Sequence, residues 1–228
     1  MFKTEKQLVN ELKKSFHSMC SWNTLRFPTH FIQEVNLGFG IADLVIYKLK
    51  DHQIRSDQNL ELNHFDISIY KIIEKNRITS VDLLHEVTGA TKKTINTAIQ
   101  KLIENSYIQK HDSIIKFCRS YQKATNEVIA IEAKLKNWKR ALDQAYRYKW
   151  FASQSFVVLD TKNIMPAKKN IQAFQKLNVG LAEINNFGVV KIIYKPLKNV
   201  PIDEVMPLVL NEFIIKLLRT EKKRSPSL

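Results

Sequence analysis

The spacing of apolar residues changes twice along this chain, and that change limits its fold more than any other feature. Apolar side chains follow a strand-like pattern within residues 30–49, recur every three or four residues within 65–117, and return to a strand-like pattern from 127. The first pattern is typical of strands and the second of amphipathic helices. We therefore expect a helical unit at 65–117, inserted between the second and third strands of an α/β core.

The segments outside the insert predict a mixed central sheet flanked by helices. Residues 4–19 have helical spacing, with Thr4 as the N-cap, and Gly38 and Gly40 separate two strands within residues 30–49. The later elements are expected to be a strand at 127–135, a helix at 137–154, a strand at 155–160, a short helix at 170–178, a hairpin at 179–196 and a helix at 203–219.

These elements predict two domains built from three segments. Residues 1–60 are expected to form the first part of the core, 61–120 the insert, and 121–228 the second part of the core with its closing helix. The stretch at 51–63 is polar and rich in turn residues, as is typical of a linker.

Within the insert, helices are expected at 66–76, 80–89 and 91–108, with a β-hairpin at 107–117. The expected caps are Ser80 and Gly89 for the second helix, and Thr91 or Thr94 for the third. Two short helices, a tight turn, a longer helix and a hairpin match a helix-turn-helix with a wing. The insert is therefore predicted to be a winged-helix domain.

Charge and cysteine content restrict the class of partner and the compartment. The 228 residues include 36 Lys and Arg against 22 Asp and Glu, a net charge of +14, which favours nucleic acid first and an anionic membrane surface second. Two isolated cysteines argue against a disulfide framework or a zinc site. The N-terminal stretch lacks the apolar core of a signal peptide, and polar residues interrupt the apolar stretch at 205–218. We expect a cytoplasmic protein without membrane association.

A pair of opposite charges interrupts an otherwise apolar strand at residues 128–135. Because side chains alternate along a strand, Glu132 and Lys134 share one face. Burying two charges costs several kcal/mol each, on the order usual for buried ions, unless something compensates. Two explanations stay open: an ion pair at a sheet edge, or a site for a metal and an anion.

Phosphodiester hydrolysis gives the second explanation a chemical basis. A hard divalent cation such as Mg²⁺ or Mn²⁺ needs oxygen ligands, and Asp43, Glu132 and the Ala133 carbonyl can supply three of them. Lys134 can hold the attacking hydroxide or stabilise the charged transition state. Glu34 is a candidate additional ligand or water-orienting base, although a plain surface role is equally compatible with its position.

These residues resemble the motif of the PD-(D/E)XK nuclease superfamily. The matching residues are Asp43 in GFGIADLVIY, Glu132 and Lys134 in IAIEAKL, and Gln144 and Tyr148 in the following helix. The resemblance covers roughly residues 4–50 and 127–160, and it departs from the family pattern in having Ala42 in place of proline. It implies a restriction-endonuclease-like core and a metal-dependent deoxyribonuclease, with endonuclease action favoured.

The same resemblance assigns roles to three further side chains, each with an ordinary structural alternative. It implies that Gln144 and Tyr148 help position the metal site or the strand, whereas a core tyrosine and a surface glutamine would look the same in sequence. Glu5 resembles the first-helix glutamate of archaeal Holliday-junction resolvases, but an exposed helix residue explains it as well. An E-x-K triplet alone also occurs by chance at solvated strand edges.

The third helix of the insert is the predicted DNA-reading element. The side chains expected on its outer face are those of Lys92, Lys93, Asn96, Thr97, Gln100 and Lys101. Lysines suit phosphates, and Asn and Gln suit adenine edges. Arg140 and Arg147, on the helix after the E-x-K strand, are further candidates for the sugar-phosphate chain. Solvated helix faces have similar compositions, and winged helices also bind proteins.

The sequence therefore predicts a divalent-metal-dependent nuclease acting on DNA, with double-stranded DNA favoured and the insert placing it. Two alternatives remain: a non-catalytic DNA-binding regulator on a nuclease-like scaffold, and a subunit whose insert docks a partner protein. The sequence leaves the oligomeric state open.

Overall fold

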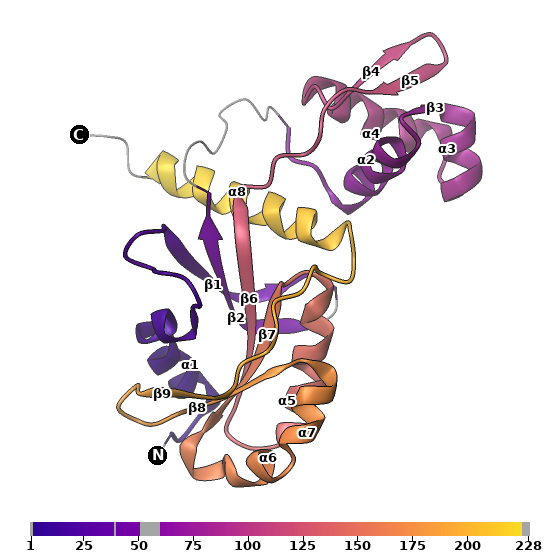
Figure 1. The fold of residues 1–228 in the computed structure, drawn as a ribbon. Coiled ribbons are helices and arrows are strands. Elements are labelled where there is room, and N and C mark those ends of the chain that lie inside the picture. The colour runs from indigo at the N-terminus through magenta and orange to yellow at the C-terminus, as the bar shows by residue number, and fades with distance from the viewer. Residues whose placement is uncertain (1, 39, 51–59, 225–228) are drawn as a thin grey trace. The chain divides into compact units, whose positions relative to one another are not determined.

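The chain forms two compact units, each built from two separate segments (Figure 1). The structure is a computed structural model that describes residues 2–38, 40–50 and 60–224. Unit 1 contains residues 2–50 and 125–203, and unit 2 contains residues 60–124 and 204–224. Most of the predicted linker at 51–63 lies outside the described residues.

Unit 1 is built on a mixed six-stranded sheet of strand order β1-β2-β6-β7-β8-β9. The three strands β6, β7 and β8 run parallel, and the outer pairings are antiparallel. The strands span β1 (Thr29–Asn36), β2 (Ile41–Leu49), β6 (Thr125–Lys134), β7 (Gln154–Asp160), β8 (Gly180–Ile184) and β9 (Val190–Tyr194). The prediction of an α/β core with a mixed central sheet is confirmed.

Helices cover both faces of this sheet (Figure 1). On one face, α1 (Glu5–Lys14) and the 3₁₀ turn η1 (Phe16–Met19) pack Leu8 and Leu12 against apolar side chains of the central strands. The helices and 3₁₀ turns between β6 and β8 are α5 (Trp138–Arg147), η2 (Tyr148–Trp150), η3 (Thr161–Asn163), α6 (Met165–Lys169) and α7 (Ile171–Leu177). Of these, α5 packs on β6 and β7, and its buried side chains include Ala141 and Ala145.

Unit 2 combines four helices with a three-stranded antiparallel sheet of order β3-β5-β4. Its elements are α2 (His64–Asn76), β3 (Ile78–Ser80), α3 (Val81–Thr88), α4 (Lys92–Glu104), β4 (Ile108–His111), β5 (Ile114–Phe117) and α8 (Met206–Arg224). The predicted caps are confirmed: Ser80 accepts the Leu83 N–H, Gly89 ends α3 at φ 67°, and Thr91 caps α4.

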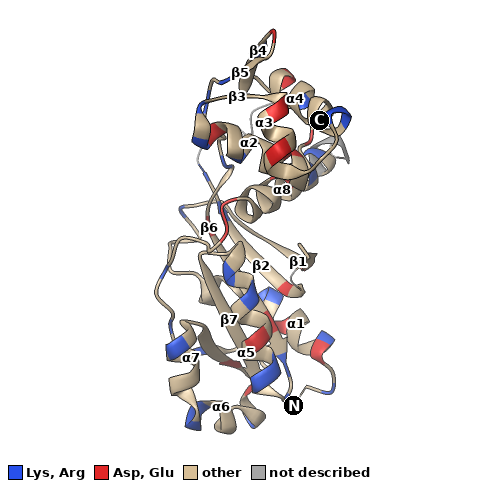
Figure 2. Cartoon of the chain, turned by 90° about the vertical axis from the view of Figure 1, so that its right-hand side faces the viewer, with Lys and Arg blue, Asp and Glu red and all other residues tan. Residues whose placement is uncertain are grey.

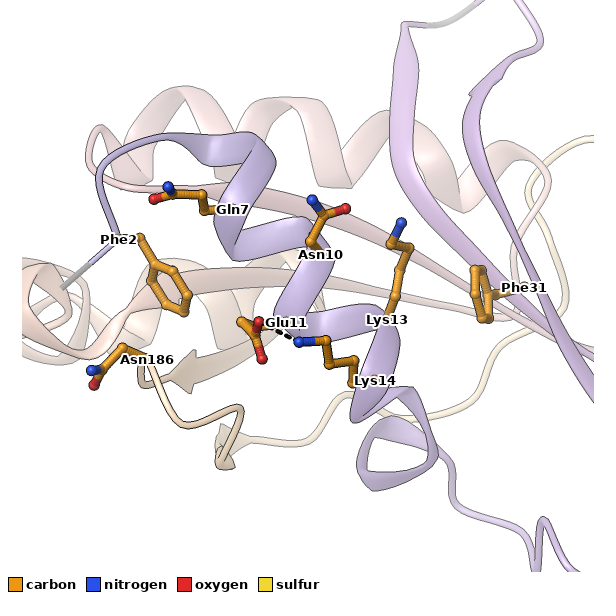
Figure 3. A pocket seen from close by; sticks show the side chains of 8 residues that line it. All are labelled: Phe2, Gln7, Asn10, Glu11, Lys13, Lys14, Phe31 and Asn186. Carbon is orange, nitrogen blue, oxygen red and sulfur yellow. Dashed lines mark hydrogen bonds and ion pairs between the residues drawn. The ribbon is translucent and has the colours of Figure 1, made fainter.

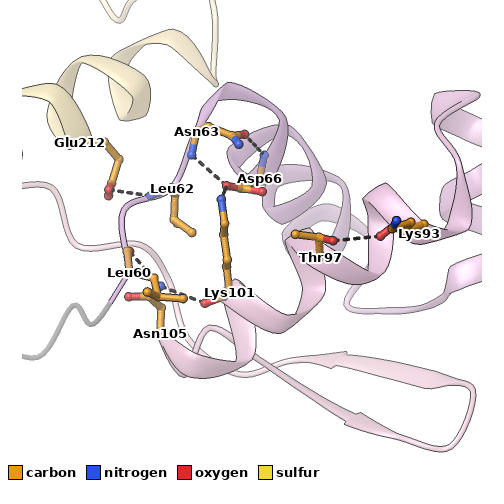
Figure 4. A network of polar contacts seen from close by, with 9 residues as sticks. All are labelled: Leu60, Leu62, Asn63, Asp66, Lys93, Thr97, Lys101, Asn105 and Glu212. Atoms are coloured by element: carbon orange, nitrogen blue, oxygen red, sulfur yellow. Dashed lines mark hydrogen bonds and ion pairs between the residues drawn. The ribbon is translucent and has the colours of Figure 1, made fainter.

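The closing helix α8 belongs to unit 2, whereas the sequence placed it with the core. Leu208 joins the apolar core of unit 2. Glu212, which is 5% exposed, accepts hydrogen bonds from the Tyr121 hydroxyl and from the Leu62 N–H at 3.1 Å (Figure 4). Asn211 donates to the same hydroxyl at 2.6 Å. These partners stand about 90 to 150 positions away, so the local pattern of α8 could not reveal them.

Other differences concern short elements. Neither the three-residue strand β3 nor the five-residue helix α6 was expected, because each is too short to show a period. The predicted helix at 4–19 ends at Lys14 and continues as a 3₁₀ turn. Among the described residues, no helix has the length and apolar character needed to cross a membrane.

Replacing Tyr121 by Phe is expected to lower the free energy of unfolding by about 1–3 kcal/mol, because two buried polar groups, Glu212 and Asn211, lose a partner. Urea unfolding measures the change. Tyr194→Phe is the matched control, since its hydroxyl makes only a 3.4 Å contact with Asn178. Equal decreases in the free energy of unfolding for the two variants would contradict a stabilising role for the hydrogen bonds of Tyr121 with Asn211 and Glu212.

Candidate active site

Three adjacent strands bring three predicted carboxylates into one row. The β1–β2 pairs on either side place Glu34 opposite Asp43. The β2–β6 register, continued one residue past its last pair, places Asp43 level with Glu132. Residues directly opposite on neighbouring strands share a face of the sheet. Residues 43 and 132 therefore share a face at one end of the sheet, and the Glu34 carboxylate is close enough to act on the charge of Asp43.

Asp43 closes the end of the β2–β6 ladder with its side chain. Its Oδ2 accepts the N–H of Ala133 at 2.7 Å, where a main-chain partner would otherwise be expected. Because the N–H and C=O of a strand residue point toward the same neighbouring strand, the Ala133 carbonyl faces the side on which Asp43 lies. This is the placement that the predicted oxygen ligand requires.

Burial raises the pKa of the Asp43 carboxyl above its ordinary value. The Ala133 N–H and the charge of Lys134 act in the opposite direction without cancelling that effect, and the carboxylates of Glu5 and Glu34 raise the pKa further. The fold therefore holds a negative charge at Asp43 at an electrostatic cost.

Glu132 is almost completely buried, with 1% of its surface exposed. Its Oε1 lies 2.9 Å from the Lys134 ammonium, and its Oε2 contacts the Tyr148 hydroxyl. Burial and the charge of Asp43 raise the pKa of Glu132, although Tyr148 and Lys134 favour its ionised form. Two neighbouring carboxyls thus both resist ionisation, which is the electrostatic condition that a bound cation relieves.

Tyr148 ties the site together from the turn after α5. Its buried hydroxyl lies within hydrogen-bonding distance of Glu132 Oε2 and, at 2.7 Å, of the Ile41 carbonyl oxygen. A hydroxyl has one proton, so it can donate to only one of these acceptors at a time. Burial and the nearby carboxylates raise the pKa of Tyr148, which keeps it protonated.

Lys134 is positioned between two carboxylates. Besides Glu132, its ammonium contacts Glu5 Oε2 at 3.2 Å. Burial opposes the charge on Lys134, but hydrogen bonds to these glutamates and the charge of Asp43 outweigh it and raise its pKa. The lysine is therefore a fixed positive charge, and Glu5, whose role the sequence left open, is its second partner.

Glu34 and Gln144 are less tightly built into the site. Glu34 is exposed, and its φ of 52° is unusual for a residue without a short polar side chain, a strain of about 1–3 kcal/mol. Gln144 is half-buried, and its Oε1 has no hydrogen-bond partner among the described residues. Only Tyr148 of the predicted Gln144–Tyr148 pair reaches the carboxylates.

The donor set fits a hard divalent cation. Asp43 and Glu132 offer carboxylate oxygens, and Ala133 offers a carbonyl on the same side. Within the described ranges, no cluster of three or more His, Cys, Asp or Glu side chains forms a metal site. A site of two carboxylates and one carbonyl does not require such a cluster, since Mg²⁺ usually keeps several waters.

No family model, curated protein or solved structure matches this chain. Its likeness to the PD-(D/E)XK superfamily therefore remains a prediction from Asp43, Glu132, Lys134 and Tyr148.

The predicted nucleic-acid contacts on α4 are mostly exposed. Lys92, Lys93, Asn96, Thr97 and Gln100 lie at the surface, and Lys92 pairs with Asp82 at 2.6 Å. Lys101 was expected on the same outer face and is instead half-buried, with its ammonium 2.6 Å from the buried Asp66 (Figure 4). This ion pair satisfies the charge of Lys101 within unit 2.

On unit 1, Arg140 and Arg147 are exposed on α5, where Figure 2 shows basic residues along the helix. A separate hollow of about 760 Å³ lies along α1, between Phe2 and Phe31, and contains the Glu11–Lys14 ion pair (Figure 3). None of the active-site carboxylates lines this hollow.

Asp43→Asn is expected to raise the melting temperature of the metal-free protein at about pH 7. The folded pKa of Asp43 lies above the unfolded one, so ionisation makes the unfolding free energy fall as pH rises through the window between them. Asn keeps an acceptor for the Ala133 N–H without the charge. Thermal melting in EDTA measures the difference, which should shrink toward about pH 3, where both states are protonated.

A variant that melts below the parent at both pH values would contradict this reading of Asp43. Adding Mg²⁺ should raise the melting temperature of the parent more than that of Asp43→Asn, because the parent has the additional charged ligand.

Proposed function

We propose that this chain is a divalent-metal-dependent nuclease that hydrolyses DNA phosphodiester bonds. The observation that carries the proposal is the convergence of Asp43, Glu132 and Lys134 at the end of β2 and β6, with both carboxyls raised in pKa and the lysine held positive. Residues about 90 positions apart in the sequence supply the charges that phosphodiester hydrolysis needs at one point.

Asp43, Glu132 and the Ala133 carbonyl are the proposed metal ligands. A bound Mg²⁺ or Mn²⁺ would neutralise developing charge and lower the pKa of an attacking water. Tyr148 fixes the Glu132 carboxylate in place through its hydroxyl. Lys134 provides a persistent positive charge for a non-bridging phosphate oxygen or for the attacking hydroxide. Glu34, exposed beside Asp43, is the proposed proton acceptor or additional ligand.

Unit 2 is proposed to be a winged-helix domain that places the duplex. Its first two helices flank β3, and α4 is followed by the β4–β5 hairpin, an order typical of that fold. Lys110 of the hairpin contacts Asn96 of α4 at 3.3 Å, so the hairpin and the outer face of α4 adjoin. Phosphate contacts are assigned to Lys92 and Lys93, and base-edge contacts to Asn96 and Gln100.

Glu132→Gln and Lys134→Ala are each expected to reduce DNA cleavage about 100-fold or more, because each removes charge stabilisation at the reacting phosphate. The assay is plasmid cleavage with Mg²⁺ or Mn²⁺ against an EDTA blank. Glu127→Gln is the matched control, since Glu127 stands on the same strand and pairs with Lys198 at 2.7 Å, away from the site.

Cleavage by Glu132→Gln at the parent rate would refute the assignment. If the parent binds DNA and neither metal supports cutting, the non-catalytic DNA-binding alternative holds.

Lys93→Ala is expected to weaken DNA binding and to reduce the slope of log K against log salt by about 1, because one phosphate contact is lost. Fluorescence anisotropy over a salt series measures both. Lys101→Ala serves as the comparison. It should leave the slope unchanged, and it should destabilise the fold because the buried Asp66 carboxylate loses its ion-pair partner. A larger slope change for Lys101 than for Lys93 would contradict the assigned outer face.

A further inference from the structure

A hollow of about 430 Å³ adjoins the candidate active site on unit 1. We call it the Lys136 pocket, and its lining residues are Glu5, Lys134, Leu135, Lys136, Asn137 and Arg140. Lys134 belongs both to this wall and to the carboxylate site, where its ammonium is 2.9 Å from Glu132. The pocket and the carboxylate site therefore share the Lys134 side chain.

The pocket has an excess of positive charge. Three of its lining side chains are basic and one is acidic, and that acid, Glu5, is already paired with Lys134 at 3.2 Å. Within the described part of the chain, neither Lys136 nor Arg140 forms an ion pair, and both are exposed. By contrast, Lys101 is held by Asp66 and Lys168 by Glu183, each within 3 Å. Lys136 and Arg140 are thus available to an anion.

The loop between β6 and α5 places both charges around the same hollow. Asn137 adopts a left-handed conformation with φ 57° and caps α5 by accepting the Arg140 N–H at 3.3 Å. This sharp turn brings the residue before it and the first turn of the helix to one pocket. The Asn137 side chain oxygen accepts the Arg140 N–H, so the role of this side chain in the pocket is to fix the turn.

The described lining of the pocket contains no aromatic side chain on which a base could stack. Trp138 packs against Phe174, with ring centroids 5.8 Å apart, and does not line the pocket. Leu135 is the single apolar lining residue. Phosphate contacts are made chiefly by Lys and Arg side chains, and the unpaired side chains around this hollow, Lys136 and Arg140, are of that kind. The chemistry of the pocket therefore fits a phosphate of the backbone.

We propose that the Lys136 pocket binds the phosphate next to the one that is cleaved. Lys136 and Arg140 hold that neighbouring phosphate independently of sequence, while Lys134 faces the scissile one. This assignment rests on the proposed nuclease function. It adds a strand-positioning subsite that acts on binding and leaves the chemical step to the carboxylates.

The test compares the double variant Lys136→Ala/Arg140→Ala with Lys139→Ala. Lys139 is the matched control because it is exposed on the same turn of α5, next to Arg140, and does not line the pocket. The binding arm measures the affinity of a short DNA duplex in EDTA over a salt series. The cleavage arm measures kcat and KM with Mg²⁺. Thermal melting confirms that each variant is folded, and Arg140→Gln with Lys136→Gln replaces the alanine pair if it is not.

The double variant is expected to raise KM about tenfold or more and to lower the slope of log K against log salt by about 2, with kcat within about threefold of the parent. Lys139→Ala should change none of these. Unchanged slope and KM in the double variant, with cleavage by the parent intact, would overturn the pocket and leave the nuclease assignment standing. If the parent cleaves no DNA, the nuclease assignment fails, and the salt slope alone decides whether the pocket binds the backbone.

A competition arm separates a nucleic-acid subsite from a site for free phosphate. Inorganic phosphate should displace duplex DNA from the parent no better than chloride at equal ionic strength. Selective displacement by phosphate that disappears in the double variant would identify a free-anion site and overturn the proposal.

Discussion

The contact between the Tyr148 hydroxyl and the buried Glu132 carboxylate is the interaction on which the rest of unit 1's candidate site depends. A carboxylate with 1% exposure is costly unless it is hydrogen-bonded. The same hydroxyl lies 2.7 Å from the Ile41 carbonyl, so one phenol joins β2, β6 and the turn after α5. The Tyr148 side chain therefore both attaches the turn after α5 to the sheet and fixes the geometry of the candidate site.

A consequence of this arrangement is that the pairing of β2 and β6 ends at the candidate site. The β2–β6 ladder ends at the pair Leu44 and Ile131, and beyond it side chains take over main-chain hydrogen bonds. Asp43 receives the Ala133 N–H, and Tyr148 reaches the Ile41 carbonyl. Replacing main-chain pairs by side chains keeps the polar groups satisfied while the strands separate, which leaves carboxylate and carbonyl oxygens facing a common space.

Local patterns in the sequence predicted much of this and missed what depends on distant partners. Alternation was enough to place Glu132 and Lys134 together, and helical spacing was enough to separate the insert from the core. The ion pair between Asp66 and Lys101 was not predictable, because Asp66 looked like an ordinary first-turn acid and Lys101 like one more surface lysine. The prediction that α8 belongs to the core was wrong for the same reason. Its amphipathic pattern shows that one face is buried, but the pattern does not show which unit buries that face. Glu5 was ambiguous until Lys134 was seen beside it.

Under the proposed function, the charge balance of the site would account for its electrostatic cost. Lys134 is one cation shared by Glu132 and Glu5, while Asp43 is held by a neutral N–H, so acid groups are in excess at the strand ends. The next turn of chain reverses the sign, with Lys136 and Arg140 around a hollow. Leaving the exposed Lys136 and Arg140 unpaired costs the fold little, whereas the half-buried Asp43 and the buried Glu132 carboxyls are ionised at a cost. The strand ends carry excess negative charge and the neighbouring hollow carries excess positive charge. A metal-bound phosphodiester would match both, because its metal ion is positive and its phosphate is negative. Conflict between local stability and charge placement is expected at functional sites, and Asp43 and Glu132 show such a conflict at the candidate site.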